Sequence, residues 1–146
     1  MHNKEIGFTL IELLITIAII GILAIVALPG LIASQKRSYD TGARMCAKSL
    51  QTAQAISHVD NETYVSMSSP QDKLEKVLKE LNSHCRNSNI FYKDRSSTDS
   101  LVTAYIFDIW DIRGVSMITV TPTNISGNTS GATPFSNSGS GGQNFP

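Results

Sequence analysis

The chain is poor in charge, in cysteine and, towards its C-terminal end, in acidic residues. Charged residues make up 16% of the 146 residues, below the usual quarter, and Lys plus Arg equals Asp plus Glu at 12 each. This balance gives no reason to expect a nucleic acid or an acidic surface as partner. No Asp or Glu follows Asp111, so the C-terminal part lacks the clustered carboxylates that a calcium site requires.

Sequence motifs of catalysis are also missing. The chain contains no P-loop, no G-x-S-x-G or H-E-x-x-H pattern and no Cys-His-Asp constellation. We therefore expect a structural or binding protein without a cofactor, a metal ion or an enzymatic activity.

One long apolar run dominates what the sequence does contain. Residues 8–33 exceed the roughly 20 residues that a membrane-spanning helix needs, and no charge lies between Leu13 and Gln35. A removable secretory signal has an apolar core of only about 7–15 residues, followed by a small-residue cleavage site. We therefore predict a transmembrane helix that stays on the mature protein, with any cleavage before Phe8 and after Gly7.

The stretch G-F-T-L-I-E, residues 7–12, resembles the class III signal of type IV pilins and of their pseudopilin relatives. Gly21 and Pro29 also stand at the usual offsets of this family. The resemblance implies a leader, residues 1–7, which a prepilin peptidase removes. It further implies N-methylation of the new Phe8 amine and polymerisation into a helical filament. Such filaments serve twitching motility, adhesion or DNA uptake.

Glu12 is a carboxylate near the start of the apolar run. A charge at the centre of a membrane helix costs about 2.5–3.5 kcal/mol, and less near an end. The amine that cleavage creates on Phe8 is a candidate partner, within the same chain or on a neighbouring subunit. Pairing between subunits would set their axial register, whereas the simpler alternative is a carboxylate that reaches the membrane interface.

Pro29 and Gly21 weaken the helix. Pro29 lacks the N–H that would bond Ile25 C=O, and glycine has low helix propensity. We predict a helix break in this interval, either as a kink in the free subunit or as an unwound segment in the filament.

A head domain is predicted at residues 34–121. The long helix should continue to about Val59, with a buried stripe at steps of three and four. A second helix should begin at a Ser69 cap with Pro70 in first position, and end near His84. The expected stripe is Tyr39, Ala43, Cys46 or Ala47, Leu50, Ala53 and Ser57.

Strands are predicted after the second helix. Residues 101–112 and 114–121 are rich in β-branched and aromatic residues and should pair through a turn at Arg113–Gly114, with 90–93 as an edge strand. The predicted fold is α+β, a long helix packed on a small antiparallel sheet. Residues 122–146 are expected to form a flexible surface tail, because their low apolar content does not offset ordering entropy. Phe135 and Phe145 are its candidate anchors.

Cys46 and Cys85 form at most one pair. An oxidising compartment outside the cytoplasm favours a disulfide over two buried thiols. A metal site formed with His58 or His84 lacks the usual ligand spacing.

The leading functional prediction is a pilus subunit anchored in the inner membrane before assembly and extracellular afterwards. Its expected partners are other copies, the prepilin peptidase and the inner-membrane assembly machinery. A pseudopilin of a type II secretion system, a minor pilin and a single-span anchor with a binding domain are the alternatives. The excess of Lys and Arg after the span points the other way, towards a cytoplasmic head. Lys93, Arg95 and Arg113 are too scattered to predict nucleic-acid binding.

Overall fold

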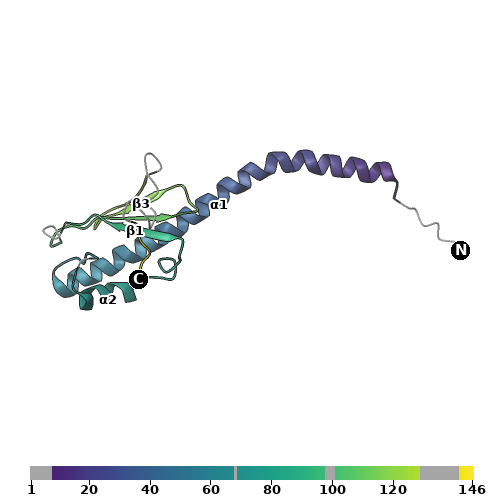
Figure 1. The fold of residues 1–146 in the computed structure, drawn as a ribbon. Coiled ribbons are helices and arrows are strands. Elements are labelled where there is room, and N and C mark those ends of the chain that lie inside the picture. The colour runs from purple at the N-terminus through teal and green to yellow at the C-terminus, as the bar shows by residue number, and fades with distance from the viewer. Residues whose placement is uncertain (1–7, 68, 98–100, 129–141) are drawn as a thin grey trace. The chain divides into compact units, whose positions relative to one another are not determined.

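The computed structural model describes residues 8–67, 69–97, 101–128 and 142–146 (Figure 1). The chain divides into two compact units, Met1–Gln35 and Lys36–Pro146. We call the second unit the head domain. Helix α1 (Leu10–Asn61) contributes to both units, which confirms the predicted long helix.

Within the head domain, α1 buries one face. Mostly small residues at steps of three and four form this face, and they belong to the core cluster. The predicted stripe is confirmed, except that Tyr39 is only half-buried, and two polar residues belong to it as well. The buried residues of α1 are Asp40, Ala43, Cys46, Ala47, Leu50, Ala53, Gln54 and Ser57.

The buried side chain of Gln54 binds the backbone of the loop that follows α1. Its Nε2 donates to Val65 O at 2.6 Å, and its Oε1 accepts from Val65 N at 2.9 Å. Both polar ends of the amide are thereby satisfied, as burial requires. The loop after α1 is held against the helix at this point.

Helix α2 (Gln71–Lys79) confirms the second helix but corrects both of its predicted ends. Its N-cap is Pro70, with no side-chain cap, and the Ser69 hydroxyl instead accepts from Ser66 N at 3.0 Å. The helix ends at Lys79 rather than near His84. Beyond its end, Asn82 N donates to Ser49 Oγ on α1 at 2.8 Å, so this N–H is used by α1 rather than by a further helical turn.

Four strands form one antiparallel sheet in the order β1-β2-β3-β4. The edge position predicted for the first strand is confirmed. On the buried face, Ile109 lies opposite Tyr92 on one side and Ile118 on the other. The strands are β1 (Ile90–Asp94), β2 (Phe107–Asp111), β3 (Met117–Val120) and β4 (Ile125–Asn128).

The second predicted strand is shorter than expected because other groups use its early backbone. Leu101 O accepts from Tyr64 N at 2.7 Å, and Val102 O lies 3.1 Å from His58 Nε2. The strand therefore begins at Phe107 rather than at residue 101. Tyr105 lies outside β2 but is buried, and this burial raises the pKa of its phenol.

The expectation of a flexible tail from Pro122 onwards is wrong in two places. Residues 125–128 form β4, and Phe145 is 7% exposed and belongs to the core. Phe145 is therefore the anchor that was predicted. Phe135, the other candidate anchor, lies outside the described residues.

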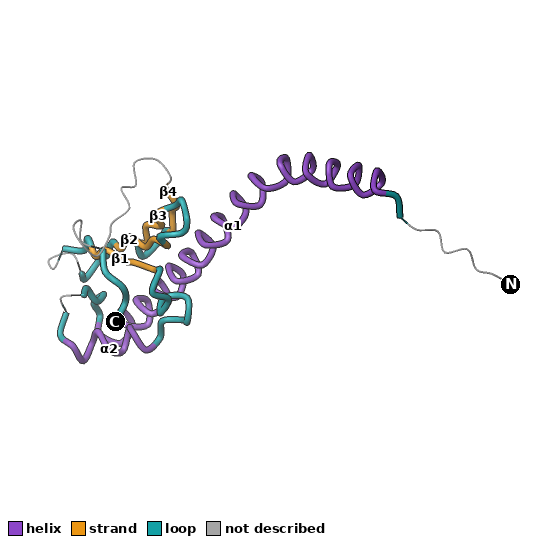
Figure 2. Tube along the Cα trace, turned by 45° about the vertical axis from the view of Figure 1, so that its right-hand side comes forward, coloured by secondary structure: helices purple, strands orange, loops and turns teal. Residues whose placement is uncertain are grey.

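The core lies between the sheet and α1, with α2 against another side of the helix (Figures 1 and 2). Phe107, Ile109, Ile118 and Val120 are fully buried on the helix-facing side of the sheet. They pack in the same cluster as Leu50 of α1. The head domain is thus an α+β fold, as predicted.

Candidate assembly segment

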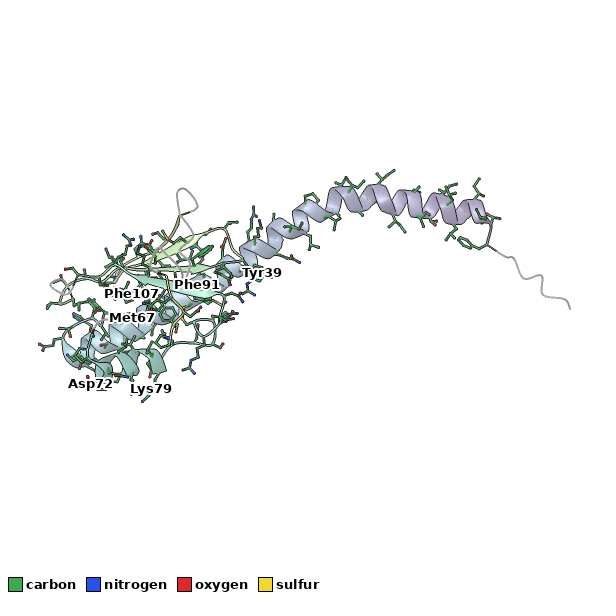
Figure 3. All side chains as sticks on the ribbon, in the orientation of Figure 1. Tyr39, Met67, Asp72, Lys79, Phe91 and Phe107 are labelled. Carbon is green, nitrogen blue, oxygen red and sulfur yellow. A yellow bond between two sulfur atoms is a disulfide. The ribbon has the colours of Figure 1, made fainter. Side chains whose placement is uncertain are left out.

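The first unit is an apolar helix without a cover. Every residue from Phe8 to Ser38 is exposed, and the large apolar side chains from Phe8 to Ile32 are 51–80% exposed. An 18-residue window of α1 has a mean hydropathy of 2.9, and the helix is long and apolar enough to cross a membrane. Figure 3 shows side chains on all sides of this helix. Such a surface requires lipid or protein around it.

Thr9 and Glu12 form a capping box at the start of α1. Glu12 Oε2 accepts from Thr9 N at 3.1 Å and from Thr9 Oγ1 at 2.7 Å. Glu12 N donates in turn to Thr9 Oγ1 at 3.3 Å. The carboxylate therefore satisfies backbone and hydroxyl donors at the positive end of its own helix.

This capping box was missed at the level of sequence, although its signal is present. A threonine followed three residues later by glutamate, ahead of an apolar run, is the usual pattern. The capping box lowers the free-energy cost of placing the Glu12 carboxylate in the apolar segment. It does so within the single chain and without an ammonium partner. Pairing of Glu12 with the Phe8 amine stays a prediction, and Gly7 lies outside the described residues.

The chain is helical through both residues of the predicted helix break. α1 includes Gly21 and Pro29 without interruption in its assignment. A Cβ atom built on Gly21 or Gly30 meets nothing within 4 Å, so contacts within this chain do not require glycine there. Unwinding of this interval in a filament stays a prediction.

A clamp joins the beginning of the head domain to the β2–β3 connection. Asp40 Oδ1 accepts from Val115 N and Ser116 N, both at 2.9 Å. Its Oδ2 accepts from Ser116 Oγ at 3.0 Å. These bonds occupy the backbone that was expected to extend the third strand, so β3 begins at Met117 rather than at Gly114. A Cβ on Gly114 would overlap the Asp40 carboxylate.

Arg113 strengthens the same connection from outside. Its guanidinium binds the Asp111 carboxylate through Nε at 2.9 Å and Nη2 at 2.8 Å, which raises the pKa of Arg113. It also lies over the Tyr39 ring, 4.2 Å from the centroid. Adjacent residues of α1, Tyr39 and Asp40, thus hold two adjacent parts of one loop (Figure 3 labels Tyr39).

We predict that Asp40→Ala lowers the free energy of unfolding of the head domain by about 3 kcal/mol. The substitution leaves the buried N–H of Ser116 and the part-buried N–H of Val115 without their charged acceptor. Asp40→Asn keeps an acceptor for Val115 and Ser116 and is expected to cost about 1 kcal/mol. Denaturant unfolding followed by the fluorescence of Trp110, the only tryptophan, measures both. Equal losses in the two variants would show that the hydrogen bonds to Asp40 contribute little.

The disulfide predicted between Cys46 and Cys85 is present. The two sulfur atoms are 2.05 Å apart, and both residues are buried. The bond ties α1 to the segment that follows α2. It also excludes the alternative of two thiols and removes both cysteines as thiolate ligands. Among the described residues, no group of three or more His, Cys, Asp or Glu side chains is placed to hold a metal ion.

A family model and two known proteins are similar to parts of this chain. The family model of the prokaryotic N-terminal methylation motif matches residues 2–28. Type IV wide pilus major component PilA4 of Thermus thermophilus is 48% identical over 66 residues, which are 45% of this chain and 50% of that protein. Type IV major pilin protein PilA of Myxococcus xanthus is 48% identical over 58 residues, 40% of this chain and 26% of that protein.

These matches confirm the predicted resemblance to type IV pilins. The chain carries the prepilin methylation motif at the start of its apolar helix, and both relatives bear the names of pilus components rather than of enzymes. The matched segments span half or less of each relative. The similarity therefore covers only part of each protein, and the role of the whole chain is a proposal.

Proposed function

We propose that the chain is the structural subunit of a type IV pilus. One observation carries the proposal. An apolar helix with every residue from Phe8 to Ser38 exposed begins inside a prepilin methylation motif. Before assembly, lipid of the inner membrane covers this helix, and in the pilus the same helix of other copies covers it. A single surface thus serves as membrane anchor and as polymerisation element.

The proposed maturation follows the same segment. A prepilin peptidase removes residues 1–7 by cutting after Gly7, and the new Phe8 amine is methylated. Residues 8–33 then form the transmembrane and filament-core helix. The inner-membrane assembly machinery extracts this helix from lipid, and the head domain is carried on the outside of an extracellular filament.

The Phe8 amine of a neighbouring copy supplies the positive charge that pairs with the Glu12 carboxylate. The capping box holds the carboxylate at the first turn of α1, where a neighbouring Phe8 ammonium meets it at one axial offset only. An ion pair in an apolar surrounding is strong and depends on position. In this proposal Glu12 sets the axial register of the subunits.

We expect filaments sheared from cells to contain this chain beginning at N-methylated Phe8. Intact mass and N-terminal peptide analysis of the pelleted filaments measure this directly. Gly7→Phe should leave the uncut precursor in the membrane and abolish filaments, because a side chain at the scissile bond obstructs approach of the backbone. His2→Ala, within the same leader, is the control and should mature normally. Filaments built from uncut chains would contradict the proposed maturation, and absence of the chain from all filaments would contradict the proposed function.

A further inference from the structure

A part of the chain that is distant in sequence pairs with the edge of β1 that faces away from β2. Residues 142–146, which we call the C-terminal strap, lie antiparallel to β1. Tyr92 N donates to Gln143 O at 2.8 Å, and Gln143 N donates to Tyr92 O at 3.0 Å. The strap thus extends the sheet beyond β1 by a short pairing. Without it, the N–H and C=O groups of Tyr92 at this edge would be unpaired.

Side chains make this contact selective. The Asn144 amide donates to Ser88 O at 2.9 Å and to Ile90 O at 2.8 Å. The Phe145 ring stacks on Tyr92, with centroids 4.4 Å apart and planes at 27°. An extended segment therefore needs an amide followed by an aromatic ring to fill this edge, as Asn144-Phe145 does.

The strap and the edge that it binds belong to opposite ends of the sheet. The strap follows β4 in the chain, yet it binds β1, and the sheet order places these strands at the two ends. With strands about 4.8 Å apart, the strap lies roughly 19 Å from β4 across the sheet. The chain from Asn128 to Gly142 spans up to about 46 Å when extended. Its length therefore exceeds what binding to its own β1 demands.

We propose that in the assembled filament the strap of one copy binds the β1 edge of a second copy. The inference rests on the proposed polymerisation. The exchanged contact uses the same hydrogen bonds and the same Phe145–Tyr92 stacking as the contact within one chain, so exchange of an identical element costs little. Because the strap and the β1 edge are different surfaces, the contact is head-to-tail. Such contacts continue from copy to copy in an open helical polymer when the rotation between copies does not close a ring.

Filament assembly also supplies the concentration that exchange requires. In dilute solution the strap meets only its own β1, whose effective concentration is on the order of millimolar for a short connection. In a filament, neighbouring head domains offer β1 edges at a comparable concentration. The strap is then divided between its own chain and a neighbour, and the exchanged fraction joins the outer surfaces of subunits.

The test is a photo-reactive group, p-benzoylphenylalanine, in place of the exposed Gln143. The variant is produced together with an excess of the unmodified chain, so that filaments form from mostly native subunits. A second variant carries the group at Pro146, which is also exposed. After irradiation of sheared filaments, denaturing gels separate monomers from dimers, and peptide mapping locates the cross-linked residue. Detergent-solubilised full-length chain at micromolar concentration is the dilute reference.

We expect on the order of tenfold more cross-linked dimer in filaments than in the dilute reference, with the link between the strap and residues 88–94. Adding Phe145→Ala should abolish the link to β1 in both samples. Monomer-sized products only, or dimers linked outside β1, in intact filaments would overturn the exchange while leaving the proposed function standing. Absence of filaments from the unmodified chain would overturn the proposed function, and the exchange with it.

Discussion

Glu12→Leu is expected to insert into the membrane, to be cleaved after Gly7 and to form no filaments. Leucine removes the insertion cost of a carboxylate and lengthens the apolar run, so anchoring should improve slightly. In a filament, however, the substitution would leave each Phe8 ammonium without its partner in an apolar surrounding. An uncompensated buried charge costs roughly 3–5 kcal/mol, and this cost recurs at every subunit contact.

The capping box allows the charge of Glu12 to be separated from its hydrogen bonds. Glu12→Gln keeps an oxygen that accepts from Thr9 but removes the charge, and glutamine serves in capping boxes. We expect this variant to fail in assembly as the leucine variant does. Thr9→Val removes the hydroxyl of the capping box and leaves the carboxylate. It should cost about 1 kcal/mol of helix stability and still form filaments.

Electron microscopy and filament yield after shearing measure all three variants, with the mass of the N-terminal peptide read alongside to monitor methylation. Wild-type numbers of filaments built only from Glu12→Leu chains would refute the register role. Assembly of Glu12→Gln but not of Thr9→Val would instead assign the role of Glu12 to capping.

Loss of the Cys46–Cys85 bond should produce the largest change in stability of the head domain. The bond closes a loop with a sequence separation of 39. In the chain-entropy model a loop of this size contributes roughly 4 kcal/mol. Cys46→Ala with Cys85→Ala should therefore lower the thermal midpoint by about 15 °C, since 1 kcal/mol corresponds to about 4 °C in a domain of this size.

Trp110 fluorescence during heating of the detergent-solubilised chain measures this midpoint. Reduced wild-type protein is the control, since it loses the bond but keeps both side chains. Thiol labelling of unfolded, unreduced wild-type protein should modify neither cysteine. Two reactive thiols per chain, or an unchanged midpoint in the double variant, would contradict the prediction.

Elements with a strong local pattern were predictable from the sequence. The apolar run defined the exposed half of α1, and steps of three and four defined its buried stripe in the head domain. Alternating β-branched and aromatic residues located β2 and β3 as partners. For the buried stripe and for the two strands, the spacing of apolar residues along the chain already determines which face is buried.

Elements that depend on distant groups were not predictable. β4 contains one large apolar residue, Ile125, and is a strand because β3 offers it a paired edge. The third strand was predicted to begin at Gly114, but Asp40 binds the N–H groups of Val115 and Ser116. These residues lie 75 and 76 positions away from Asp40 in the sequence. α2 ends early because Ser49 of α1 takes the N–H of Asn82. Tertiary contacts overrode local propensity at all three places.

The candidate site likewise has a part that the local sequence predicts, whereas the strap contact depends on distant residues. Its chemical groups, Phe8 and Glu12, stand in a local motif and were found by reading that motif. The capping box was equally local and was missed only because the charge of Glu12 suggested an ionic partner. The strap contact was beyond sequence reasoning, because nothing in Gln143-Asn144-Phe145 names β1 as its partner.

The burial of Phe145 has a consequence for the order of folding. Ribosomes release the N-terminal helix first, yet the ring that completes the core belongs to residue 145. The head domain therefore cannot complete its core until residue 145 has left the ribosome, and contacts of long sequence separation form slowly. Until synthesis passes this residue, β1 presents an open edge to other nascent chains. A holding chaperone is needed most during this interval, and chains truncated before residue 142 should aggregate through β1.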